Sequence, residues 1–99
     1  MDQINARQLQ QRLQAGEALN MLDVREEIEY HTYNIGGLNI PLGKLQQDIN
    51  QLNHNKTDEI IVICQAGLRS QTAQAFLTQQ GYQNVKNLTG GLLALRRLQ

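Results

Sequence analysis

The pattern of apolar and polar positions along the 99-residue chain alternates between segments typical of strands and segments typical of helices. Two short segments, 18–23 and 85–88, are mostly apolar and predict strands, and residues 39–40 allow a further, very short one. Between them, Ile60-Ile61-Val62-Ile63 forms a continuous β-branched run. A run without polar interruption is typical of a strand that is covered on both faces.

Apolar residues at helical spacing predict helices between these strands. Three of these helices span residues 6–13, 42–52 and 92–98. Two more are expected: a short helix with Glu26 in its first turn, and a helix that ends at Gly81. Asn5 and Gln8 fit a capping box at the start of the first helix, and Gly16 is placed to end it. Because strands alternate with helices, we expect residues 1–99 to form a single α/β domain with a mainly parallel sheet between helical layers.

Composition and charge narrow the possible classes of function. Nine basic and nine acidic side chains give no net charge, which argues against binding nucleic acid or a membrane surface through bulk charge. The chain has neither a basic, apolar leader nor a long apolar run, so we expect no membrane segment and a cytoplasmic location. One cysteine excludes an intramolecular disulfide, and the two histidines, His31 and His54, are far from it in sequence. We therefore expect no metal and no cofactor.

The segment that carries candidate chemistry is the loop Cys64-Gln65-Ala66-Gly67-Leu68-Arg69-Ser70. Cys64 follows the most apolar strand, and ligands of parallel sheets bind where strands end. Gly67 can adopt backbone angles that other residues resist, and Ser70 is a good N-cap for the next helix. The amides of residues 65–70 would then converge on an anion and favour the thiolate of Cys64, which is the nucleophilic form.

A lone cysteine after an apolar strand is often only a small buried side chain. Here the strand, the glycine loop, the arginine and the helix start occur together, and this combination favours a nucleophile over a core residue. Arg69 adds a fixed positive charge that can hold an anionic group.

The loop resembles the active-site loop of the rhodanese-like sulfurtransferases, Cys-x-x-Gly-x-Arg-Ser/Thr. Other segments resemble the family in the same order over nearly the whole chain: Leu22-Asp23-Val24-Arg25-Glu26 with Glu29-Tyr30, Asn39-Ile40-Pro41-Leu42, Gly81 to Val85, and Leu88-Thr89-Gly90-Gly91. The resemblance implies a rhodanese-like fold, with about five mainly parallel strands flanked by helices on both faces. It also implies a sulfurtransferase in which Cys64 takes a sulfane sulfur from thiosulfate or a persulfide, and passes it to a thiol, to cyanide or to a sulfur-carrier protein.

The roles of the neighbouring residues stay open at this point. Arg69 either binds the anionic donor or braces the loop, since arginines at such sites often pair with a carboxylate. For Asp23 and Arg25 an internal ion pair or a brace of the loop is favoured over a direct role in the site. Gln65 and Ala66 are neutral where some thiosulfate-using members carry basic residues, which leaves the donor open between thiosulfate and a persulfide.

Three other functions compete with sulfur transfer by an enzyme. Phosphatases of the related fold need five residues between cysteine and arginine, whereas residues 65–68 supply four. A sulfur-relay or binding module is the second alternative, although the chain retains the cysteine that a catalyst needs. A redox sensor usually uses a second, resolving cysteine, which is absent from this sequence.

Overall fold

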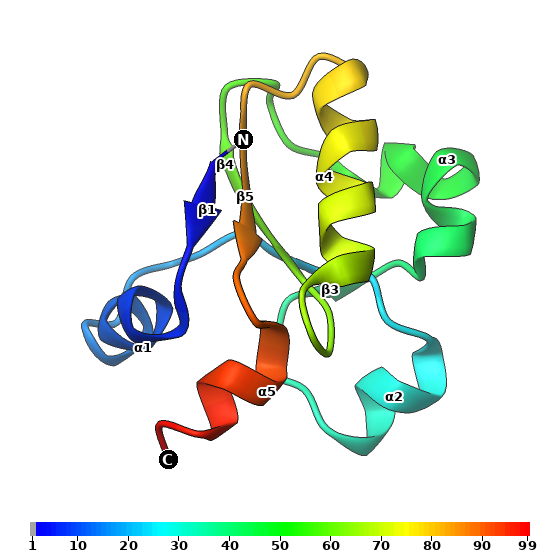
Figure 1. Ribbon diagram of the computed structural model, residues 1–99. Helices are drawn as coiled ribbons and strands as arrows, with labels where there is room; N and C mark the ends of the chain where they lie inside the picture. The colour runs from blue at the N-terminus through cyan, green and yellow to red at the C-terminus, as the bar shows by residue number, and fades with distance from the viewer. Residues whose placement is uncertain (1) are drawn as a thin grey trace.

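The computed structural model describes residues 2–99, which form one five-stranded sheet. The strand order is β1-β5-β4-β2-β3, and every neighbouring pair is parallel (Figure 1). The strands are β1 (Gln3–Ile4), β2 (Met21–Asp23), β3 (Leu38–Asn39), β4 (Glu59–Ile63) and β5 (Asn84–Leu88). The predicted parallel α/β architecture is confirmed.

Five α-helices connect or follow the strands: α1 (Ala6–Gln14), α2 (Glu27–Thr32), α3 (Leu45–Asp48), α4 (Leu68–Gln79) and α5 (Gly91–Arg96). The predicted capping box is present, because the Asn5 side chain accepts the Gln8 N–H and the Gln8 side chain accepts the Asn5 N–H. The short helix predicted with Glu26 in its first turn is present, but it begins one residue later, at Glu27, and Glu26 is its N-cap.

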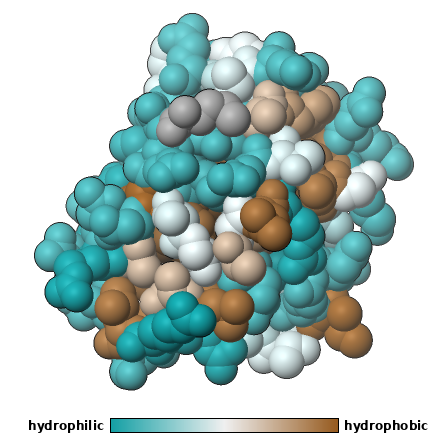
Figure 2. Space-filling view, in the orientation of Figure 1, coloured by the Kyte–Doolittle hydropathy of each residue, from teal (hydrophilic) through white to brown (hydrophobic). Residues whose placement is uncertain are grey.

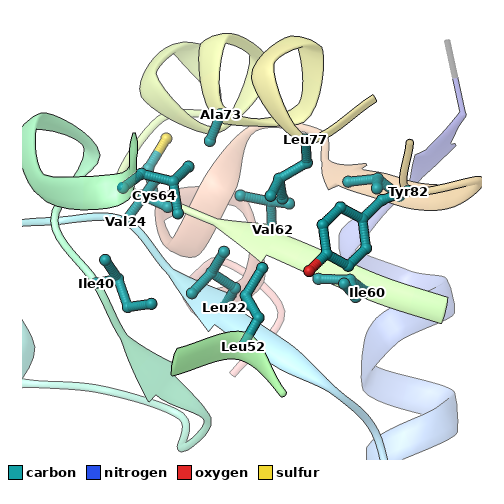
Figure 3. Close-up of a cluster of buried hydrophobic side chains, with 12 residues drawn as sticks. Leu22, Val24, Ile40, Leu52, Ile60, Val62, Cys64, Ala73, Leu77 and Tyr82 are labelled. Carbon is teal, nitrogen blue, oxygen red and sulfur yellow. The ribbon is translucent and has the colours of Figure 1, made fainter. Parts of the chain in front are cut away.

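The helices cover both faces of the sheet, and β4 divides the hydrophobic core into two clusters. Ile60 and Val62 belong to the cluster under α3 and α4, where Figure 3 shows Val62 facing Ala73 and Leu77 of α4. The intervening side chains of β4, at positions 61 and 63, pack in the second cluster, with α1 and α5. All four side chains of the run are at most 1% exposed. The coverage on both faces that the β-branched run predicts is therefore confirmed.

Three elements differ from the predictions. The segment 18–23 forms a strand only from Met21, which pairs with Ile61 of β4. The segment 42–52 is broken into a 3-10 helix (Leu42–Lys44), α3 and a second 3-10 helix (Ile49–Leu52), and φ widens to −107° at Lys44 and −106° at Asp48, where the elements meet. The two-residue strand β1 gave no periodic signal in the sequence.

Hydrophilic side chains cover most of the face seen in Figure 2, and apolar side chains reach it in separate small groups. The two most exposed large apolar side chains are Ile28 on α2, at 77%, and Leu68 at the start of α4, at 73%. None of the helices within residues 2–99 has the length and apolar character needed to cross a membrane.

Candidate active site

The loop between β4 and α4 lies at the carboxyl end of the sheet, next to α2 and α5 (Figure 1). Cys64 is its first residue and is 1% exposed. Figure 3 shows its side chain beside Val24, on the side of the sheet that α4 covers. The end of the most apolar strand thus delivers the only cysteine of the chain to the edge where parallel sheets bind their ligands.

The start of α5 is hydrogen-bonded to the backbone of Cys64 and Gln65. The Leu92 and Leu93 N–H groups each donate to a carbonyl of the loop, to Cys64 O and Gln65 O respectively, both at 3.0 Å. A Cβ atom at Gly91 would lie 2.4 Å from Gln65 O and 2.5 Å from Cys64 O. Glycine at position 91 is therefore what allows α5 to approach the loop closely enough to make these bonds.

The sulfur of Cys64 accepts two backbone hydrogen bonds from the start of α4. The Gly67 N–H lies 3.1 Å from Sγ and the Ser70 N–H lies 3.3 Å from it. Both amides belong to the N-terminal end of a twelve-residue helix, where the helix dipole also favours negative charge. Of the loop residues singled out in the sequence, these two direct their amides at the sulfur, while Gln65, Ala66, Leu68 and Arg69 complete the turn around it.

The prediction that Ser70 is the N-cap of the helix is wrong. Gly67 is the N-cap, with a φ of 97°, and α4 begins at Leu68. The left-handed conformation, which glycine adopts without a steric penalty, turns the chain into the helix three residues earlier than expected. Ser70 is instead a buried residue inside the first turn, and its Oγ lies 3.3 Å from Cys64 Sγ.

Arg69 binds a carboxylate of α2. Its Nη1 and Nη2 atoms donate to the two oxygens of Glu29, at 2.6 and 3.0 Å. These hydrogen bonds lower the pKa of Glu29 to about 2 and raise the pKa of Arg69. The guanidinium is thus committed to tying the loop to α2, which supports the bracing alternative for Arg69 over binding of the donor.

Asp23, the last residue of β2, forms a buried ion pair with Arg25. Arg25 Nη2 lies 2.8 Å from Asp23 Oδ2, and both side chains are at most 3% exposed. The same guanidinium donates to the Tyr33 carbonyl at 2.7 Å, beyond the end of α2. The Arg25 guanidinium is thus bonded only to Asp23 and to backbone carbonyls. These contacts support the predicted internal brace, which holds α2 beside the loop.

Two residues of this region were missed in the sequence, Glu29 as the partner of Arg69 and Asn87 behind the loop. Glu29 is separated from Arg69 by 40 positions, so no local spacing could pair them. Its place three residues after Glu26, whose N–H it accepts, indicates only a capping role. Within residues 2–99, no three histidine, cysteine or acidic side chains gather where they could hold a metal ion.

Comparison with known proteins agrees with this architecture. The family model of the rhodanese-like domain matches residues 5–97. A Bacillus subtilis (strain 168) protein named "Putative sulfur carrier protein YrkF" is 40% identical over 91 residues, which cover 91% of this chain but only 48% of that protein. The thiosulfate sulfurtransferase PspE of Escherichia coli (strain K12) is 36% identical over 76 residues, covering 76% of this chain and 72% of PspE.

Among solved structures, the crystal structure of a rhodanese-like domain protein from Staphylococcus aureus has a TM-score of 0.85 and 25% sequence identity. The match covers 96% of this chain and 91% of that one. The family model covers most of this chain, and its fold matches that of a solved rhodanese-like domain. The chain therefore belongs to the rhodanese-like domain family.

Proposed function

We propose that residues 1–99 act as one catalytic domain, a sulfurtransferase that carries a sulfane sulfur as a persulfide on Cys64. The observation that carries this proposal is the pair of α4 amides, from Gly67 and Ser70, that donate to Cys64 Sγ. Donors fixed in this way stabilise negative charge on sulfur without rearrangement during the reaction. The names of two relatives, one a thiosulfate sulfurtransferase and one a sulfur carrier, support the same chemistry.

The first half-reaction loads the sulfur. The Cys64 thiolate attacks the outer sulfur of thiosulfate, the Cys64 S–S bond forms, and the S–S bond of thiosulfate breaks to release sulfite with its electron pair. A persulfide donor would react in the same way and release its own thiolate. Because the thiolate is the attacking form, no general base is needed once the two amides favour that form.

The second half-reaction transfers the outer sulfur from Cys64 to an acceptor. An acceptor thiolate or cyanide attacks the outer sulfur of the persulfide, and the Cys64 thiolate leaves with the electron pair of the broken S–S bond. With cyanide the product is thiocyanate. Since Cys64 is the only cysteine within residues 1–99, no second thiol of this domain can resolve the persulfide, and the acceptor comes from outside the domain. A persistent free thiol also fits the cytoplasmic location expected from the sequence.

In this proposal the remaining residues of the site hold the loop in shape. Gln65, Ala66 and Leu68 form the turn around the sulfur, while Arg69 and Glu29 tie that turn to α2. Arg25, paired with Asp23, holds the end of α2 through its hydrogen bond to the Tyr33 carbonyl. Asp23, Arg25, Glu29 and Arg69 are positioning residues, because their side-chain hydrogen bonds go to one another and to backbone groups rather than to Cys64 Sγ.

The phosphatase alternative is disfavoured by the same geometry. An arginine that binds phosphate must direct its guanidinium toward the nucleophile, whereas both Nη atoms of Arg69 bind Glu29. The short loop of four residues between Cys64 and Arg69 points the same way.

Steady-state release of thiocyanate from thiosulfate and cyanide tests the proposal. We expect parallel-line, ping-pong kinetics for the wild type and loss of turnover in Cys64→Ser, because a hydroxyl does not form the persulfide. Hydrolysis of an aryl phosphate by the wild type, without thiocyanate release, would support the phosphatase instead. Sulfur uptake without turnover to any small acceptor would support the relay module.

A further inference from the structure

Asn87 on β5 lies behind the Cys64 loop and has no assigned role. It is 2% exposed, and its side chain contacts two residues of the loop and of α4, Gly67 and Ser70. A polar side chain buried to this extent is favourable only if its hydrogen bonds are made. The way in which they are made determines what the Ser70 hydroxyl can offer to Cys64.

The orientation of the Asn87 amide follows from its partners. Nδ2 lies 3.4 Å from the Gly67 carbonyl oxygen, which can only accept a hydrogen bond. The amide nitrogen therefore faces Gly67, and Oδ1 faces Ser70. Because Oδ1 is also only an acceptor, the Ser70 hydroxyl donates its proton to Asn87.

The Ser70 hydroxyl has one proton and two possible recipients. Its Oγ lies 3.3 Å from Cys64 Sγ, within hydrogen-bonding reach. While the proton is given to Asn87, Oγ can only accept, and a Cys64 thiol has a proton to donate to it. A thiolate has none, so it gains a third hydrogen bond only if the hydroxyl rotates away from Asn87 and toward the sulfur.

We propose that Asn87 is a positioning residue that acts through Ser70: it holds the hydroxyl proton while Cys64 Sγ is uncharged and yields it when Sγ becomes a thiolate. This inference rests on the proposed function, in which Sγ is uncharged as a thiol and again as the inner sulfur of the persulfide. Each turnover thus includes one rotation of the Ser70 hydroxyl toward Sγ and one back. Asn87 therefore competes with the Cys64 thiolate for the proton of the Ser70 hydroxyl.

The charged groups on the elements around the loop are unchanged by substitutions at Asn87 and Ser70. They are the pairs Arg69–Glu29, Arg25–Asp23 and Lys44–Glu27, with Glu26 at the start of α2 and Arg96 on α5. A change in the thiolate midpoint in those variants therefore reports on the hydroxyl and the amide, not on altered charge.

The test is the pH dependence of Cys64 alkylation by iodoacetamide, measured for the wild type, Asn87→Leu, Ser70→Ala and the double variant. We expect Asn87→Leu to lower the thiolate midpoint by about one pH unit, the scale of one hydrogen bond to a charged group. In the Ser70→Ala background the same substitution is expected to have no effect, because no hydroxyl remains to be released. An equal shift in both backgrounds, or no shift in either, would overturn the proposal.

Gln74→Leu is the matched control. Gln74 is also buried between α4 and β5, where its Nε2 donates to the Val85 carbonyl at 2.8 Å, but it has no bond to Ser70. We expect this variant to lose stability and keep the wild-type midpoint. If Asn87→Leu does not fold, Asn87→Ala removes the same acceptor. Because alkylation requires no sulfur donor, coupling between Ser70 and Asn87 without thiocyanate release would reject the proposed function while leaving this inference standing.

Discussion

At the amino end of β4, Glu59 lies between Arg12 of α1 and Lys86 of β5. Beyond the carboxyl end of the same strand, Glu29 of α2 binds Arg69 in the first turn of α4. Glu59 accepts from both Arg12 Nη atoms, at 2.6 and 3.0 Å, and from Lys86 Nζ at 2.6 Å. The pKa of each carboxyl is lowered to about 2, chiefly by the arginine hydrogen bonds in both cases.

The two ends of β4 differ in which hydrogen-bond donors remain after those that bind the carboxylates are counted. Around Glu59 both Arg12 Nη atoms and Lys86 Nζ donate to one carboxylate, and Arg12 Nε donates to Glu17, so the cluster joins α1, β4 and β5. At the other end the arginine is used in the same way, but the Gly67 and Ser70 amides remain directed at Cys64 Sγ. Similar ion pairs therefore join elements at one end of the strand and brace the turn around Cys64 at the other.

The largest effect is expected from Gly91→Ala, which disrupts only the carboxyl end. The added Cβ would lie 2.4 to 2.5 Å from the carbonyls of Gln65 and Cys64, so the loop or α5 must shift. A displacement on the order of 1 Å at a reacting group costs about 100-fold in rate, and we expect at least that loss in kcat/KM.

Gly16→Ala is the control for this substitution. Gly16 is also left-handed, with a φ of 78°, but an added Cβ there meets nothing within 4 Å. It should cost about 1 kcal/mol of stability from backbone strain and leave activity intact. Equal activity losses in both variants would show that the loss comes from strain and not from the loop.

Glu59→Gln and Glu29→Gln compare the two ends directly. We expect Glu59→Gln to lower the free energy of unfolding by about 2 kcal/mol, because a part-buried carboxylate with three charge-assisted bonds is neutralised, with kcat/KM unchanged. Glu29→Gln should cost less than about 1 kcal/mol, since both partners are about a third exposed. Its effect should fall on kcat/KM, by about tenfold, because the loop loses its brace.

Urea unfolding and thiocyanate release, measured on the same preparations, give the two quantities. The opposite result, in which Glu59→Gln reduces activity and Glu29→Gln reduces only stability, would contradict the proposed difference between the two ends of β4.

The smallest effect is the contribution of these carboxylates to acid sensitivity. In each case the pKa of the folded state, about 2, lies below the ordinary value of 4.5. The stability that they provide is therefore complete above about pH 5 and is lost as the pH falls toward 2. Urea unfolding at about pH 6 and about pH 3 should show a smaller loss of stability on acidification in Glu59→Gln than in the wild type. An unchanged difference would mean that Glu59 does not act as an ionised partner of Arg12.

The parts of the fold that could be predicted from sequence are those that local pattern determines. The run 60–63 predicts a strand covered on both faces because its side chains alternate between two cores, and Asn5 with Gln8 makes a capping box within one turn of helix. Segment 42–52 shows where this fails. Its apolar spacing correctly identifies Leu45 and Leu52 as buried, but not the interruptions at Lys44 and Asp48, which depend on how the segment packs.

At the site, Cys64 and its loop were recognisable because strand, glycine and helix start follow one another in sequence. The polar partners were not, since they come from other elements. Arg69 meets Glu29 across 40 positions, and the Ser70 hydroxyl meets Asn87 across 17. Ser70 was misassigned as the N-cap because residue type alone favours serine there, whereas the left-handed Gly67 sets the start of the helix.

The central claim, a persulfide on Cys64, is tested most directly by intact mass spectrometry of the protein after incubation with thiosulfate or a small persulfide. We expect a mass gain of one sulfur atom per chain, its loss on addition of cyanide, and no gain in Cys64→Ser. A wild-type protein that acquires no sulfur from either donor, or a Cys64→Ser variant that acquires it as readily as the wild type, would contradict it.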